Sequence, residues 1–321
     1  MEKIKVFFTN NMLKENKSFS PSSYKPKLVL KDWMSSYSNQ LEVSTFNKLS
    51  VEDLYLAHDK KYVDGVLNGK IKNGFGFKDK EFSKTFYYTV GSLYSACEYA
   101  LKNKIAISPT SGFHHAKYKK AGGFCTFNGL AISAILLKKN LNVNKVGILD
   151  FDMHYGNGTE DIINKLNLNY IEHYTAGKHY DLHYPSISFI KPFIKFFYNK
   201  LFKPKKNGST PLPKLRQKIL KGKNTEFLNN VPEILEKFKS CDILIYQAGA
   251  DQHINDPYGG LLNNDELVER DKLVFEFCKN NDIPIVWNLA GGYQKDNDGT
   301  IEPILSIHRN TMATCLQVFS Q

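Results

Sequence analysis

Several short segments of this chain hold residue types that can bind a metal ion. Residues 150–154 (DFDMH) place acidic and imidazole side chains two residues apart, and Asp251 follows a second apolar run. In an extended segment, residues two apart point to the same face, so Asp152 and His154 can share one ion. The alternative is a solvated loop whose aspartates cap turns, with Asp251 as a helix N-cap or turn residue.

An Asp–His–Asp ligand set would leave one coordination position open for water, which is typical of a catalytic metal site and not of a structural one. A metal-bound water could then ionise near neutral pH. Because the ligands are mostly hard oxygens with no sulfur, we expect zinc, with Fe²⁺, Co²⁺ or Mn²⁺ as alternatives.

Two adjacent histidines are candidates for a general base and its electrostatic partner, and a tyrosine is a candidate oxyanion donor. His114 and His115 can divide this work if their partners differ, since a carboxylate such as Asp150 favours the charged imidazole far more than an amide such as Asn157. Tyr293 follows two glycines, which allow a tight backbone path and bring its hydroxyl towards the metal as an oxyanion donor. The alternatives are surface or core histidines and a buried tyrosine bonded elsewhere.

The elements that must position these residues alternate between strand and helix. Short β-branched or aromatic runs predict strands at 3–9, 105–108, 146–150, 170–173, 243–247 and 283–289. Helical patterns cover 85–101, 127–139, 226–238 and 265–279. Most of the strands lack polar alternation, as strands buried on both faces do. This order predicts an α/β fold: a single domain over 1–321 with a parallel, doubly wound sheet flanked by helices.

The candidate residues directly follow predicted strands. Residues 111–115 follow the strand at 105–108, residues 150–158 follow the next, and Asp251 and Tyr293 follow the last two. Ligands of parallel sheets bind beyond the carboxyl ends of the strands. We therefore expect these segments to meet at one edge of the sheet, which favours the metal-site interpretation over isolated turn residues.

The composition is that of a globular protein of the cytoplasm. The chain has 321 residues, of which 42% are hydrophobic, enough for a sizeable core. It shows no secretory signal and no membrane-spanning run. Its five cysteines form no CxxC pair, so neither a disulfide framework nor a thiolate zinc site is expected.

The net charge of +11 is concentrated in one segment. Residues 191–223 hold eleven Lys or Arg and no acidic residue, which leaves 32 basic and 32 acidic residues elsewhere. We expect a basic, aromatic insertion at about 186–223. The simplest interpretation is a surface insertion. An alternative is peripheral contact of residues 189–206 with an anionic membrane or an acidic partner, which suits this segment better than specific nucleic-acid binding.

Five motifs of the chain resemble those of the histone deacetylase family, including bacterial histone-deacetylase-like amidohydrolases and acetylpolyamine deacetylases of the arginase/deacetylase superfamily. They are residues 112–116 (GFHHA), 122–128 (GGFCTFN), 150–159 (DFDMHYGNGT), 249–251 (GAD) with 256–257 (DP), and 291–293 (GGY). Their order and spacing match over roughly 51–293.

The resemblance implies a zinc-dependent deacetylase that hydrolyses the linear amide of an N-acetylated amine, either acetyl-lysine in protein or an acetylpolyamine. Its zinc ligands would be Asp152, His154 and Asp251. It also implies His115 as general base and then acid, and Tyr293 as oxyanion donor.

Further roles follow from the same resemblance. His114 would pair with Asp150, the Gly123 carbonyl would accept the substrate amide, and Phe124 would form one wall of an acyl-lysine tunnel. A potassium ion is implied near Asp150 and His154. Tyr155 stands where the family usually has a second histidine, and residues 174–180 lack the usual proline- and glycine-rich turn, so the opposite wall of the tunnel is left unassigned.

Two other functions remain open. A ureohydrolase of the same fold would use two manganese ions and additional aspartates, and the tandem histidines with Tyr293 argue against it. A non-catalytic acetyl-lysine-binding protein would keep the pocket, but the chain also keeps the ligands, the histidines and the tyrosine.

Overall fold

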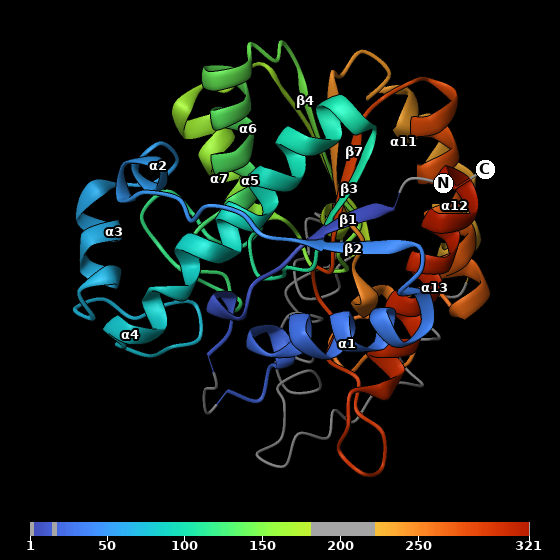
Figure 1. The fold of residues 1–321 in the computed structure, drawn as a ribbon, viewed down its shortest axis with the longest axis horizontal. Helices are drawn as coiled ribbons and strands as arrows, with labels where there is room; N and C mark the ends of the chain where they lie inside the picture. The colour runs from blue at the N-terminus through green and yellow to red at the C-terminus, as the bar shows by residue number, and fades with distance from the viewer. Residues whose placement is uncertain (1–2, 15–17, 181–221, 321) are drawn as a thin grey trace, which may run out of the picture.

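A parallel sheet runs through the part of the chain that this computed structural model describes, residues 3–14, 18–180 and 222–320. The seven strands found there lie in the order β2-β1-β3-β7-β6-β4-β5 (Figure 1). They are β1 (Ile4–Phe7), β2 (Leu41–Ser44), β3 (Ile105–Ser108), β4 (Val146–Asp150), β5 (Ile171–Thr175), β6 (Ile243–Gln247) and β7 (Ile285–Asn288). Every pair of neighbouring strands is parallel.

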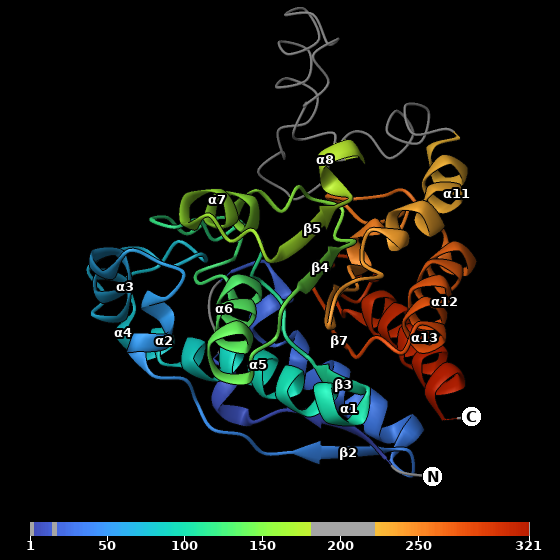
Figure 2. The ribbon, with the colours of Figure 1, turned by 90° about the horizontal axis from the view of Figure 1, so that it is seen from above.

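Helices cover both faces of the sheet. One face packs on a cluster that includes α3 (Lys60–Leu67), α5 (Thr85–Asn103), α6 (Gly129–Leu141) and α7 (Asn157–Leu166). The other face packs on α1 (Lys25–Tyr37), α11 (Lys223–Glu236), α12 (Asn264–Asn280) and α13 (Glu302–Phe319). Figure 2 shows α5 and α6 on one side of the sheet and α12 and α13 on the other. The predicted doubly wound parallel sheet is confirmed.

The remaining helical segments are short and lie in the connections. They are α2 (Val51–Tyr55), α4 (Lys80–Ser83), α8 (Gly177–Tyr180), and the 3-10 turns η1 (Asn10–Met12), η2 (Pro21–Ser23) and η3 (Ala250–Gln252).

The sequence prediction missed strand β2, the helices α1, α3, α7 and α13, and the short helical segments of the connections. In β2 and α13 the core-facing pattern is interrupted. In β2 only Leu41 is buried, because this strand lies at the edge of the sheet and Glu42 and Val43 are exposed. In α13 the buried stripe contains His308 and Thr311, which weaken its apolar period. Strand β5 also extends to Thr175, two residues beyond its predicted end.

Residues 181–221 lie outside the described part of the chain, and most of the predicted basic insertion at 186–223 lies there. The suggested contact of 189–206 with a membrane or an acidic partner therefore gains no support. None of the described helices is both long and apolar enough to cross a membrane. All five cysteines are buried and none forms a disulfide. The sequence had predicted no disulfide framework.

A fully buried cation, Arg270 of α12, holds the loop after β6 in place. Its Nε donates to Asp271 Oδ1 at 2.9 Å, while Nη1 donates to the Gly249 carbonyl at 2.8 Å and to Gln252 Oε1 at 2.9 Å. Hydrogen bonds to charged groups in a low dielectric are strong, but only while every partner is present. This network therefore fixes the segment 249–252 that carries Asp251.

We expect Arg270→Met to lower the free energy of unfolding by about 3–5 kcal/mol, because it leaves Asp271 buried without its cation. Urea unfolding measures this loss. Lys272→Met is the control, because Lys272 is exposed and its ammonium forms a weak surface ion pair with Glu276, with an N–O distance of 3.7 Å. This variant should change the free energy of unfolding by less than about 1 kcal/mol. Equal stability of both variants would contradict a structural role for Arg270.

Candidate metal centre and active site

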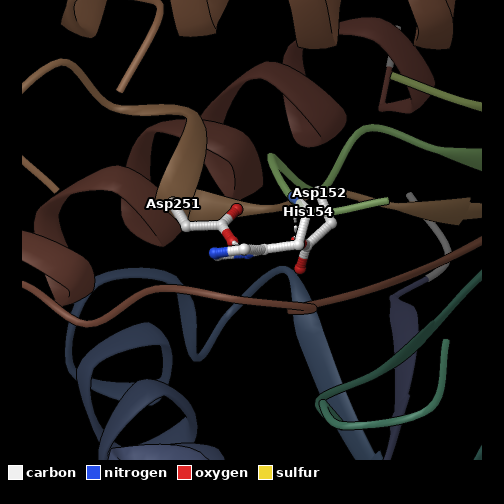
Figure 3. Close-up of side chains that lie close together, drawn as sticks. All are labelled: Asp152, His154 and Asp251. Carbon is white, nitrogen blue, oxygen red and sulfur yellow. Dashed lines mark hydrogen bonds and ion pairs between the residues drawn. The ribbon is translucent and has the colours of Figure 1, made fainter. Parts of the chain in front are cut away.

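Two carboxylates and one imidazole converge at the carboxyl edge of the sheet (Figure 3). Asp152 and His154 follow β4, and Asp251 lies in η3 after β6, the neighbour of β4 in the sheet. His154 Nδ1 is 3.1 Å from Asp152 Oδ1 and 2.8 Å from Asp251 Oδ2. One ligand atom from each residue lies within 4.8 Å of the others, which is close enough for all three to bind one ion.

The electrostatics of this cluster require a positive charge at its centre. Asp152 is 2% exposed and Asp251 is 0% exposed, and among the described residues neither forms an ion pair with Lys or Arg. Burial opposes the charged form of His154, but the two carboxylates outweigh it and raise the pKa of His154 well above its usual value. Burial, and then the charge of Asp152, raises the pKa of Asp251 to about 7. A divalent cation fits this site because it neutralises both carboxylates together.

Backbone groups orient the two carboxylates. The Gly291 N–H donates to Asp152 Oδ2 at 2.7 Å, and the Met153 N–H donates to Asp251 Oδ1 at 3.0 Å. A Cβ at Gly291 would collide with both carboxylates, so this position requires glycine. Lys25, a buried residue with no local sequence signal, donates from Nζ to the Gly291 carbonyl at 3.1 Å.

The two adjacent histidines have different partners. His114 Nδ1 lies 2.7 Å from Asp150 Oδ2, and His115 Nδ1 lies 3.2 Å from Asn157 Oδ1. Burial opposes the charged form of His114, but Asp150 and Asp152 outweigh it and raise the pKa of His114 to about 9. Burial, reinforced by the charge of His114, lowers the pKa of His115 to about 3. One imidazole is thus held charged and the other neutral, although their ring centroids are only 4.1 Å apart.

Tyr293 lies in the loop after β7, beside the Asp–His–Asp cluster. Its ring centroid is 6.1 Å from that of His154, and its backbone N–H donates to Asp256 Oδ2 at 2.8 Å. Burial raises the pKa of Tyr293 well above its usual value. The phenol therefore keeps its proton and remains a hydrogen-bond donor near the Asp–His–Asp cluster.

An aromatic wall leads from the surface towards Tyr293. Phe124, held at a positive φ of 63°, packs edge-to-face on Phe19 with ring centroids 5.2 Å apart. The ring centroid of Tyr258 lies 5.7 Å from that of Phe19 and 5.2 Å from that of Tyr293. Phe19 is 58% exposed, so its ring stands at the outer end of this wall.

Of the residues in this wall, the sequence prediction named Phe124 and Tyr293 and missed Phe19 and Tyr258. Tyr258 directly follows the 256–257 (DP) motif, which was the available signal for it. Phe19 belongs to an irregular segment far from every motif, so only the folded chain brings it to the site. Gly123, the other predicted substrate contact, lies against His115, and a Cβ there would collide with the imidazole ring. Its carbonyl accepts a hydrogen bond from Cys125 Sγ at 3.3 Å.

The chain matches a known family over most of its length. The model of the histone deacetylase domain matches residues 21–302. The chain belongs to the histone deacetylase family. The resemblance found in its motifs is thereby confirmed, and this is a family of hydrolases.

Individual relatives carry deacetylase names. Histone deacetylase 2 of Arabidopsis thaliana is 29% identical over 213 residues, 66% of this chain and 50% of that protein. Polyamine deacetylase HDAC10 of Danio rerio is 30% identical over 124 residues, 34% of this chain and 18% of that protein. The chain therefore spans half or less of the length of these two relatives.

A solved structure shares the fold. The acetylpolyamine aminohydrolase from Burkholderia pseudomallei superposes with a TM-score of 0.70 at 15% identity, covering 98% of this chain and 99% of that one. This supports the arginase/deacetylase-like sheet predicted from the sequence.

We expect Asp152→Ala, His154→Ala and Asp251→Ala each to lose the metal, because two remaining ligands leave the ion mostly solvated. Metal content per purified chain, measured by mass spectrometry, tests this. Asp161→Asn is the control, since its carboxylate only accepts the Tyr118 N–H at 2.9 Å. Wild-type metal content in the three variants would remove these residues from the ligand set, and two ions per wild-type chain would favour a ureohydrolase.

Proposed function

We propose that this chain is one catalytic domain that hydrolyses the amide of an N-acetylated amine, either acetyl-lysine in a protein or an acetylpolyamine. The observation that carries the proposal is the buried Asp–His–Asp cluster at residues 152, 154 and 251, with His114 bonded to a carboxylate and His115 bonded to an amide beside it. Membership of the histone deacetylase family and the names of the relatives support it.

Asp152, His154 and Asp251 would hold the metal. Zinc is the proposed ion, with Fe²⁺, Co²⁺ or Mn²⁺ as alternatives, because the ligands combine hard oxygens with one nitrogen. When bound, such an ion polarises the amide carbonyl and makes water a nucleophile at neutral pH. A potassium ion near Asp150 and His154 belongs to the same proposal.

His115 is the proposed proton carrier. Its Nδ1 faces Asn157 Oδ1, an acceptor, so Nδ1 holds the ring proton and Nε2 presents its lone pair. The neutral ring can take a proton from the attacking water and return it to the leaving amine. His114, kept protonated by Asp150, places a positive charge beside the negative charge that develops during attack.

The remaining contacts position the acyl group. The Tyr293 hydroxyl would donate to the oxyanion, because burial keeps it protonated. The Gly123 carbonyl would accept the substrate N–H, and Phe124 with Phe19 would pack on the aliphatic chain that leads to the amide.

Two alternatives are less favoured by the geometry. A binuclear ureohydrolase needs ligands for two ions, and the described residues contain one group of three ligands. A non-catalytic acetyl-lysine reader has no use for two imidazoles poised at different charge states.

We expect Tyr293→Phe to lower kcat on a fluorogenic acetyl-lysine substrate about a hundredfold, the effect of losing one oxyanion donor. Metal content should stay at the wild-type level. Tyr258→Phe is the matched control, since its ring neighbours Tyr293 and should change kcat little. Chelator should abolish wild-type turnover and added zinc restore it. Turnover that survives both chelator and Tyr293→Phe would reject the mechanism.

We expect Phe19→Ala to raise KM for the same substrate about fivefold with little change in kcat, because it removes apolar contact shared by ground and transition states. Leu141→Ala, an exposed apolar side chain at the end of α6, is the control and should change neither constant. A loss confined to kcat would show that Phe19 acts on the reacting groups and not on the acyl chain.

A further inference from the structure

A second hollow adjoins the reaction centre on the side of His115. It is an open pocket of about 340 Å³, lined by His115, by Asn157, by the segment 121–123 and by Lys117 and Lys120. No acidic residue is among the described residues that line it. The proposed proton carrier and two lysine residues therefore line one pocket.

The two lysines are set by a tight turn. The Lys117 N–H donates to the Lys120 carbonyl at 2.8 Å, and the Lys120 N–H donates back at 3.3 Å. The chain then turns again, with Gly123 at a positive φ of 50° and Phe124 at 63°. The same loop thus carries both the lysine pair and Phe124 of the aromatic wall.

The charges of this pair are uncompensated. Lys119, which lies between them in sequence, has a partner, since its Nζ is 3.4 Å from Asp59 Oδ2. Within the described ranges, no ion pair or hydrogen bond of the ammonium groups of Lys117 and Lys120 is found. Two unpaired cations at the edge of a pocket attract an anion and repel a cation.

We propose that Lys117 and Lys120 bind a carboxylate of the substrate, so that the site selects acetyl-lysine with acidic groups beside it and disfavours acetylpolyamines. This proposal rests on the proposed deacetylase function and narrows its substrate class. Acetylpolyamines carry further ammonium groups, which would meet the same two lysines. The carboxylate has two sources, an Asp or Glu side chain next to acetyl-lysine in a peptide, or the α-carboxylate of free acetyl-lysine.

The test compares kcat/KM for two peptides that differ only in the residues flanking acetyl-lysine, two glutamates in one and two glutamines in the other. The wild-type chain should prefer the acidic peptide about fivefold at low salt, the scale of two partly exposed ion pairs, and lose this preference as salt screens the charges. In the Lys117→Gln/Lys120→Gln variant the ratio should fall to about one, and kcat/KM for acetylputrescine should rise. A comparison of kcat/KM for free acetyl-lysine and for its C-terminal amide shows whether the α-carboxylate, and not a neighbouring side chain, is bound.

Lys119→Gln is the matched control, because it removes an adjacent charge that is paired with Asp59, and it should keep the wild-type ratio. Binding of both labelled peptides, followed by fluorescence anisotropy, gives the same comparison without turnover. A preference in binding with no hydrolysis of any acetylated substrate would reject the deacetylase function and keep the anion site. Equal affinities and equal kcat/KM for both peptides in the wild-type chain would overturn the anion site. If the preference for the acidic peptide falls as much in Lys119→Gln as in the double variant, the preference comes from net charge and the anion site is also overturned.

Discussion

The structure is organised around two buried carboxylates whose negative charges are brought close together around one imidazole. Asp152 and Asp251 converge on one imidazole nitrogen, His154 Nδ1. Burial raises the free energy of each ionised carboxylate, and their mutual repulsion adds to it. Backbone N–H groups and a glycine with no room for a Cβ hold them in place nevertheless. The fold therefore keeps an arrangement that a bound cation, or protonation of His154 and Asp251, relaxes.

The parallel sheet explains how the chain maintains this arrangement. The last paired positions of four neighbouring strands align as Ser108, Asn288, Gln247 and Asp150, and all four side chains are buried. Each is a polar residue that ends an apolar run, just before a loop that carries residues of the site. Because strands buried on both faces are apolar throughout, these transitions are visible in the sequence. The meeting of Asp152, His154 and Asp251 could be predicted from sequence for that reason, since β6 lies beside β4 and the loops after them come together.

Other parts of the site leave no such trace. Lys25 reaches the backbone of the loop after β7 from the start of α1, and both residues that accept its hydrogen bonds are more than 260 positions away. Burial lowers the pKa of Lys25 to about 8, while Asp251 and Asp152 oppose that shift. Nothing in the local pattern around Lys25 or Phe19 marks them as part of a site, because their contacts exist only after the sheet has formed. Long-range packing of irregular segments is what sequence periodicity does not encode.

The contrast between the two histidines shows how one atom of a partner decides the chemistry. His114 and His115 are adjacent, buried and intrinsically identical, so burial lowers the pKa of both. Asp150 reverses that effect for His114 because its carboxylate carries a full negative charge. Asn157 offers His115 the same kind of oxygen acceptor without the charge, so it orients the ring and fixes its tautomer while leaving burial in control. A carboxylate at position 157 would raise the pKa of His115 and reduce the difference between the two imidazoles. The neutral amide at position 157, together with burial and the charge of His114, thus favours a His115 that can accept a proton.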